Sequence, residues 1–163
     1  MRIALLPSAY APQVGGVEIL TAQLAKSLVE AGHEAEVWAP APSVADGRCA
    51  DCIDGLRVRR FSYHAPRGSL TPMLQWTLRA PSTVLALRSA ARSFRPDVLH
   101  VQCFGVNGFY ATVLSIVTGI PLAVTLQGET FMDDHDIYAR SIFLRTGLRL
   151  GLAGPGMGER TRH

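Results

Sequence analysis

Long apolar runs are missing from this sequence of 163 residues, although 48% of its residues are hydrophobic. No run approaches the roughly 20 apolar residues that a membrane-spanning helix needs. The N-terminal stretch MRIALLPSAYAP also lacks the long apolar region and the small-residue cleavage site of a secretory signal. We therefore expect a cytoplasmic protein that is long enough to bury one good core.

Cysteine and lysine are scarce as well. One C-x-x-C, formed by Cys49 and Cys52, lies in a predicted loop, and Cys103 stands alone. A zinc site would lack its second pair of ligands, so we interpret all three cysteines as ordinary thiols and expect no bound metal. Lys26 is the single lysine, and the arginines are scattered around a net charge of +3. A charge so small and dispersed argues against a nucleic-acid partner.

Short apolar segments alternate with segments of helical periodicity along the chain. The apolar segments predict strands at 2–7, 34–40, 55–63, 96–102 and 120–128. The periodic segments predict helices at 17–31, 82–94, 107–119 and 136–150. In the first helix the predicted apolar face is Val17, Leu20, Leu24, Leu28 and Ala31. Strands separated by helices are typical of the α/β class, here a Rossmann-like, doubly wound and mostly parallel sheet.

In such sheets ligands bind outside the carboxyl ends of the strands. The loop after the first strand holds an adjacent glycine pair, Gly15 and Gly16, just before a helix. Two explanations are open: close approach of a phosphate- or sugar-bearing ligand to the backbone, or a turn that needs positive φ. The G-x-G-x-x-G fingerprint and the P-loop are absent, which argues against an ordinary NAD enzyme or NTPase.

Three stretches, in order, resemble the N-terminal domain of family 4 glycosyltransferases of the GT-B fold. They are MRIALLPSAYAPQVGGVEILTAQLAKSLVEAGHEAEVWAP, RPDVLHVQ and IPLAVTLQGE, and the glycine pair followed by Val17 and Glu18 is the most specific part. The resemblance implies retaining transfer of a sugar from a nucleotide-sugar to an acceptor hydroxyl, without an essential metal or other cofactor. It also implies that this domain mainly binds the acceptor, while Gly15 and Gly16 face the donor phosphates across a cleft.

The resemblance gives candidate site residues in the three loops. The catalytic candidates are Gln127, Glu129 and His100. The acceptor-binding candidates are Tyr10, Glu18, His100, Asn107, Gln127, Gly128 and Glu129. Family members often carry a T-x-H-G-x pattern where this chain has residues 125–129, and here Gln127 replaces the histidine. Gln127 can hydrogen-bond a sugar hydroxyl but cannot titrate near neutral pH. His100 is equally explained as a satisfied histidine at a strand end, and Glu129 as an acceptor of local N–H groups.

The end of the chain departs from the family. We expect the family-like domain at 1–150, an irregular and disordered tail at 151–163, and no C-terminal donor-binding domain. The chain is then the N-terminal half of an enzyme, inactive alone, either as a fragment or with a separate polypeptide that supplies the other half. The expected ligands are a nucleotide-sugar and a glycan, lipid or small-molecule acceptor. A peripheral contact of the protein with the inner face of a membrane is a further open expectation.

Two other functions stay open. A non-catalytic binding or scaffold module would use the same cleft. A metal-dependent nucleotide-sugar enzyme is suggested by the D-x-D of Asp134 and Asp136, since carboxylates at this spacing can share a hard cation. Acidic residues just ahead of a predicted helix are, however, also what a helix N-terminus favours.

Overall fold

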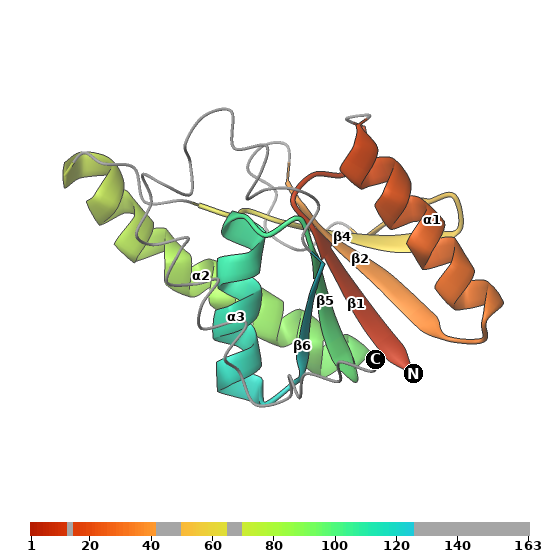
Figure 1. Ribbon diagram of the computed structural model, residues 1–163. Coiled ribbons are helices and arrows are strands. Elements are labelled where there is room, and N and C mark those ends of the chain that lie inside the picture. Colours follow the sequence, from red (N-terminus) through yellow and green to blue (C-terminus); the bar gives the residue numbers. More distant parts are fainter. Residues whose placement is uncertain (13–14, 42–49, 65–69, 126–163) are drawn as a thin grey trace, which may run out of the picture.

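The computed structural model describes residues 1–12, 15–41, 50–64 and 70–125 (Figure 1). They form six strands: β1 (Arg2–Pro7), β2 (Glu34–Pro40), β3 (Ala50–Ile53), β4 (Leu56–Phe61), β5 (Val98–Gln102) and β6 (Leu122–Thr125). They also form three helices: α1 (Gly16–Glu30), α2 (Leu70–Phe94) and α3 (Val106–Thr118). The predicted helix at 136–150, the D-x-D motif and the tail at 151–163 lie outside the described residues.

The strands make one sheet in the order β3-β4-β2-β1-β5-β6. Every pair is parallel except β3 with β4. The predicted α/β class and mostly parallel sheet are therefore confirmed. The edge strand β3 was not predicted, although Asp54 and Gly55 between β3 and β4 both have positive φ (51° and 80°) and form a dipeptide that favours hairpins. Cys52 accordingly lies in a strand, where it is exposed and not disulfide-bonded, and not in a loop.

Helices cover both faces of the sheet (Figure 1). Leu5 and Leu6 of β1 are both fully buried, but alternation along the strand sends them into opposite layers. Leu5 packs in the layer under α1, which Ala25 enters from the helix. Leu6 packs in the layer under α2 and α3, with Leu87 and Leu114. Burial on both faces explains why β1 reads as a continuous apolar run.

The buried face of α1 differs from the predicted one. Thr21 and Ala25 are the buried residues of this helix, whereas Leu20, predicted to face the core, is 48% exposed. Small residues let the helix approach the sheet closely, and Leu24 and Leu28 pack only at the edge of this layer. The apolar periodicity therefore predicted the helix correctly, but part of its apolar surface faces outward.

Helix α2 is much longer than the predicted segment at 82–94, because the chain continues as a helix through Pro81. Proline removes a backbone donor and is therefore uncommon inside a helix. Ala80, Val84 and Leu87 nevertheless pack against the core on either side of it, and Pro81 itself is exposed. Tertiary packing here outweighs the local preference. Helix α3 ends as predicted, with Gly119 in the left-handed conformation (φ 74°).

Candidate functional site

The carboxyl ends of the five parallel strands lie at one edge of the sheet, where the loops that precede α1 and α3 also lie (Figure 1). Backbone hydrogen bonds join these loops: Ser8 N–H donates to Gln102 O at 3.2 Å, and Cys103 N–H donates to Thr125 O at 3.1 Å. The ends of β1, β5 and β6 are thus held in a fixed arrangement.

The glycine pair begins α1. Gly15 is the N-cap, with an extended backbone (φ −156°, ψ −176°), and Gly16 is the first helical residue. Neither has positive φ, so the explanation as a turn that requires positive φ is wrong for both positions. A methyl group on Gly16 would meet no described atom within 4 Å. The N–H groups of a helix's first turn have no partner within the helix and favour anions.

Glu18 lies against this pair. A Cβ placed on Gly15 would lie 2.7 Å from Glu18 Oε2, the far end of a flexible side chain. An acidic residue in the first turn also stabilises the helix through its dipole. Glu18 is therefore at the N-terminus of α1, next to the predicted phosphate-facing residues.

Tyr10 is 5% exposed and packs under the guanidinium of Arg60, whose Cζ lies 6.0 Å from the ring centroid. Burial raises the pKa of the Tyr10 hydroxyl, the Asp54 charge adds to this shift, and the Arg60 charge opposes it. Arg60, itself buried, donates hydrogen bonds to Ala11 O and to Pro40 O. The first loop is therefore fastened to the ends of β2 and β4 by an arginine that the sequence pattern did not single out.

A buried pair joins α1 to β5. Thr21 and Gln102 are 0% and 3% exposed, and the Thr21 hydroxyl hydrogen-bonds Gln102 Oε1 at 2.7 Å. Thr21 Oγ1 also lies 2.6 Å from Val17 O in the first turn of the helix. The pair fixes where the N-terminus of α1 stands relative to the end of β5. It was not predicted, because the two residues are distant in the sequence.

Asn107, predicted to bind the acceptor, is 3% exposed, and its amide is engaged by the backbone. Its Nδ2 donates to Leu6 O at 2.8 Å and to Cys103 O at 3.2 Å. Its Oδ1 accepts from Gly105 N–H at 2.9 Å. These bonds tie the start of α3 to the end of β1, which makes Asn107 a positioning residue in this structure.

His100 lies inside β5, two residues before its last residue, Gln102, and on the same face. Its Nε2 is 2.8 Å from Thr125 Oγ1. Burial lowers the pKa of His100, which keeps the ring neutral near pH 7. Thr125 is the last described residue before the segment that holds Gln127, Gly128 and Glu129, and these three lie outside the described residues.

The described part of the chain contains neither a cluster of metal-binding side chains nor a membrane-spanning helix. No group of three His, Cys, Asp or Glu side chains there could hold a metal ion. None of the helices there is long and apolar enough to cross a membrane.

Comparison with known proteins gives a family. The family described as "Glycosyl transferase 4-like domain" matches residues 15–155. A GDP-mannose-dependent alpha-mannosyltransferase of Mycobacterium tuberculosis (strain CDC 1551 / Oshkosh) is 29% identical over 130 residues, which are 79% of this chain and 32% of that protein. The chain thus spans about a third of the length of this curated relative.

Solved structures share the fold. Sucrose-phosphate synthase from Thermosynechococcus elongatus matches with a TM-score of 0.60 at 17% identity, over 93% of this chain and 39% of that one. UDP-GlcNAc 2-epimerase from Neisseria meningitidis matches with a TM-score of 0.54 at 15% identity, over 94% of this chain and 38% of that one. A synthase and an epimerase at such low identity show a shared architecture only, that of one half of the GT-B fold. The family match over residues 15–155 goes further and shows that this chain belongs to the glycosyl transferase 4-like domain family.

Proposed function

We propose that this chain is the acceptor-side domain of a retaining glycosyltransferase, which transfers a sugar from a nucleotide-sugar to an acceptor hydroxyl. The observation that carries the proposal is the open N-terminus of α1, where Gly16 has no described neighbour at the position of a Cβ. GDP-mannose is the first donor to test, because the curated relative is a GDP-mannose-dependent enzyme.

The proposed role of the glycine pair is to let the donor diphosphate approach the helix. The first-turn N–H groups of α1 would donate to the phosphate that leaves, and the helix dipole favours the negative charge that develops there. A side chain on Gly16 would stand in this space. The Thr21–Gln102 hydrogen bond and the Arg60–Ala11 hydrogen bond hold the helix and its preceding loop in place for this contact.

His100 and Thr125 are proposed to position the acceptor segment that follows β6. Their hydrogen bond of 2.8 Å fixes the last described residues before Gln127. Because its pKa is lowered, His100 remains a neutral hydrogen-bonding group near pH 7. We propose that Glu18, in the first turn of α1, orients an acceptor hydroxyl.

We also propose that the chain transfers no sugar by itself, because the donor would be held mainly by a second domain. The test is a chimaera that joins this chain to the C-terminal part of the mycobacterial relative, assayed for mannose transfer beside the chain alone. Turnover by the chimaera and none by the chain supports the proposal. Binding of an acceptor by the chain, measured by calorimetry, with no turnover in any chimaera would favour the non-catalytic module.

Gly16→Asp in that chimaera tests the phosphate contact directly. A carboxylate at the first helical position stabilises the helix but repels a diphosphate, so we expect turnover to fall by a factor of about a hundred or more with no loss of thermal stability. Ser27→Asp adds the same charge at an exposed position near the other end of α1 and serves as the matched control. Equal turnover in the two variants would refute the phosphate contact.

A further inference from the structure

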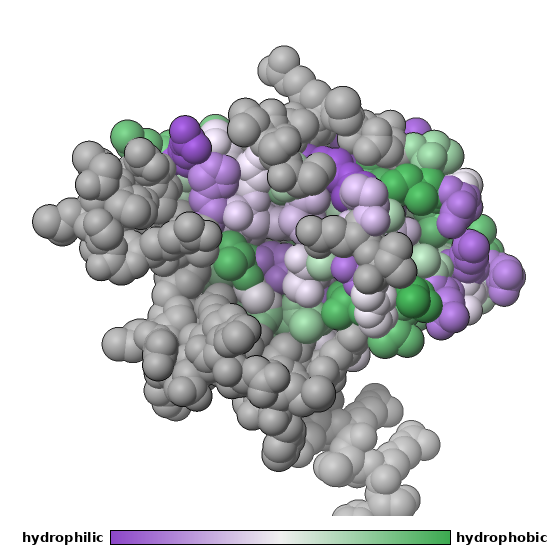
Figure 2. Space-filling model, turned by 90° about the horizontal axis from the view of Figure 1, so that it is seen from above, coloured by the Kyte–Doolittle hydropathy of each residue, from purple (hydrophilic) through white to green (hydrophobic). Residues whose placement is uncertain are grey.

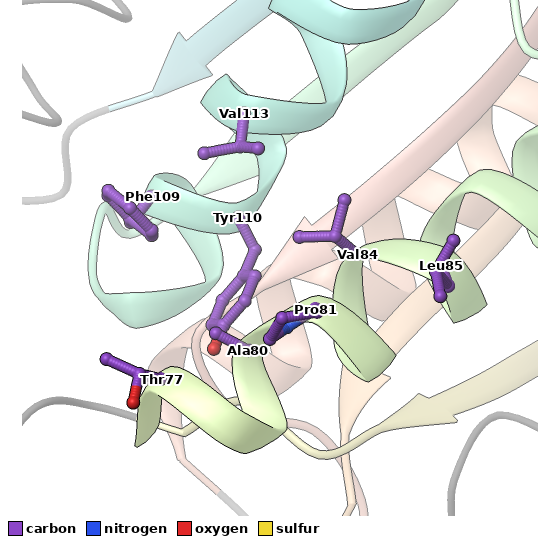
Figure 3. A pocket seen from close by; sticks show the side chains of 8 residues that line it. All are labelled: Thr77, Ala80, Pro81, Val84, Leu85, Phe109, Tyr110 and Val113. Carbon is purple, nitrogen blue, oxygen red and sulfur yellow. The ribbon is translucent and has the colours of Figure 1, made fainter. Parts of the chain in front are cut away.

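Helices α2 and α3 form an apolar groove on the side of the sheet opposite α1 (Figure 3). It has a volume of about 540 Å³. The lining residues are Thr77, Ala80, Pro81, Val84 and Leu85 of α2 and Phe109, Tyr110 and Val113 of α3. The Tyr110 hydroxyl, one of the few polar groups here, donates to His64 O at 3.1 Å. A groove of this composition suits hydrocarbon.

The apolar surface extends beyond the groove. On α2, Leu78 is 73% exposed and Leu85 is 64% exposed. On α3, Ile116 and Val117 follow Val113 at helical spacing, so they continue its face, and both are exposed. Large apolar side chains gathered on two adjacent helices indicate a surface that is covered in use.

The charges on these two helices are all of one sign. Arg79, Arg88 and Arg92 are the charged residues of α2, which has no acidic residue, and α3 has no charged residue at all. Arg88 follows Val84 by four positions and Leu85 by three, which places it on the next turn beyond the groove. Among the described residues Arg88 and Arg92 have no ion pair, whereas Arg57 and Arg59 on the sheet both pair with Glu36.

We propose that the α2–α3 face docks on an anionic lipid surface. Exposed leucine and isoleucine side chains would enter the hydrocarbon boundary, and the groove would accept part of a lipid chain. The guanidinium groups of Arg88 and Arg92 would bind the lipid phosphates, for which arginine geometry is well suited. A second copy of the chain is a poorer occupant, because a two-fold contact would bring the same cationic face against itself. This inference does not depend on the glycine pair or on sugar transfer.

The experiment is co-sedimentation of the full chain with vesicles. We expect binding to vesicles of phosphatidylcholine mixed with phosphatidylglycerol, weaker binding at high salt, and little binding to phosphatidylcholine alone. Arg88→Glu combined with Arg92→Glu should reduce affinity for the anionic vesicles by roughly tenfold or more, and Leu85→Glu should reduce it as well. Arg88→Glu alone should also weaken binding, whereas its matched control Lys26→Glu, a single charge reversal at an exposed position of α1, should bind nearly as the parent does.

Circular dichroism melts show whether each variant is folded. We expect all of them to fold, because the four substituted positions are exposed. Equal loss of binding in Lys26→Glu and in Arg88→Glu would overturn the proposal, since net charge alone would then explain the affinity. Absence of binding to anionic vesicles would also overturn it. Light scattering that shows a dimer abolished by Leu85→Glu, without vesicle binding, would assign this face to a second copy instead.

Discussion

Helices α1 and α3 both start at the carboxyl edge of the sheet with a glycine N-cap, yet their surroundings are opposite. At α3 the Gly105 N–H donates to Asn107 Oδ1, and a Cβ on Gly108 would lie 2.4 Å from the ring of Phe104. Neither N-cap glycine has a side-chain cap, but at α1 a Cβ on Gly16 would touch no described atom. Gly108 thus permits internal packing, whereas Gly16 borders no described atom.

The two helix starts lie at the same edge of the sheet. Gly108 serves the stability of the fold, whereas Gly16 serves ligand binding in the function proposed above. Figure 2 looks down on the molecule from above, and green residues appear on the α1 side of the described surface, at the right. Ile19 and Leu20 in the first turns of α1 are 50% and 48% exposed. The start of α1 therefore combines a Gly16 position without described neighbours and exposed apolar side chains, whereas the start of α3 is closed by its own side chains.

The largest expected effect is on stability, from Gly108→Ala. The added methyl group would overlap the buried Phe104 ring, which cannot move without disturbing the core. We expect the free energy of unfolding to fall by about 3 kcal/mol, the upper part of the usual range for overpacking. Chemical denaturation of the chain measures this. A stability equal to that of the parent would remove the contrast between the two helices.

Gly16→Ala makes the same chemical change at the start of α1. We expect the free energy of unfolding to change by no more than about 0.5 kcal/mol, because the methyl group meets no described atom and φ is compatible with alanine. In the two-domain chimaera turnover should fall about a hundredfold, as for the loss of one oxyanion donor. A variant that unfolds early but keeps its turnover per folded molecule would contradict the assignment.

Asn107→Ala should destabilise the start of α3 by about 2 kcal/mol, because the buried carbonyl of Leu6 and the N–H of Gly105 lose their partner. Asn107→Asp keeps the acceptor for Gly105 but cannot donate to Leu6, so it separates the two contributions. Thermal unfolding of both variants gives the comparison. If acceptor binding by the chimaera is lost while stability is unchanged, Asn107 is a binding residue and not a positioning one.

Thr21→Val removes the hydrogen bond between α1 and β5 with little change in volume. We expect a loss of about 1 kcal/mol in the free energy of unfolding. In the chimaera we expect the fractional loss of turnover to exceed the fractional loss of stability, because the N-terminus of α1 is no longer fixed against Gln102. Thr21→Ser retains the hydroxyl. Compared with Thr21→Val, it should recover more of the lost turnover than of the lost stability.

The smallest expected effect is a pH dependence from His100. Burial lowers its pKa in the folded chain, so the unfolded chain binds more protons between the folded pKa and the ordinary value of about 6.5. Stability is therefore highest above pH 6.5 or so and falls as the pH drops through the folded pKa. Unfolding measured across this range should show a shallower slope in His100→Gln. An unchanged slope would mean that another group is responsible.

Local patterns in the sequence determined much of the fold. The apolar runs at Arg2–Pro7 and Glu34–Pro40 coincide with β1 and β2, and the helix closed by Gly119 coincides with α3. These segments combine strong periodicity with clear end signals, so local preference and tertiary packing agree. The family was likewise evident from three stretches of the sequence, because their order and spacing are specific.

Other features were decided only by tertiary contacts. Pro81 lies within α2 because packing on both sides of it outweighs the lost backbone bond, and Leu20 is outside because small residues face the sheet. The sequence has glycines at the start of both α1 and α3, but it does not show that their roles differ. That distinction depends on what occupies the space beside each glycine, which at Gly108 is the Phe104 ring and at Gly16 is no described atom. Phe104 precedes Gly108 by only four residues, but the position of its ring is decided by its burial in the core, which forms only when the helices dock on the sheet.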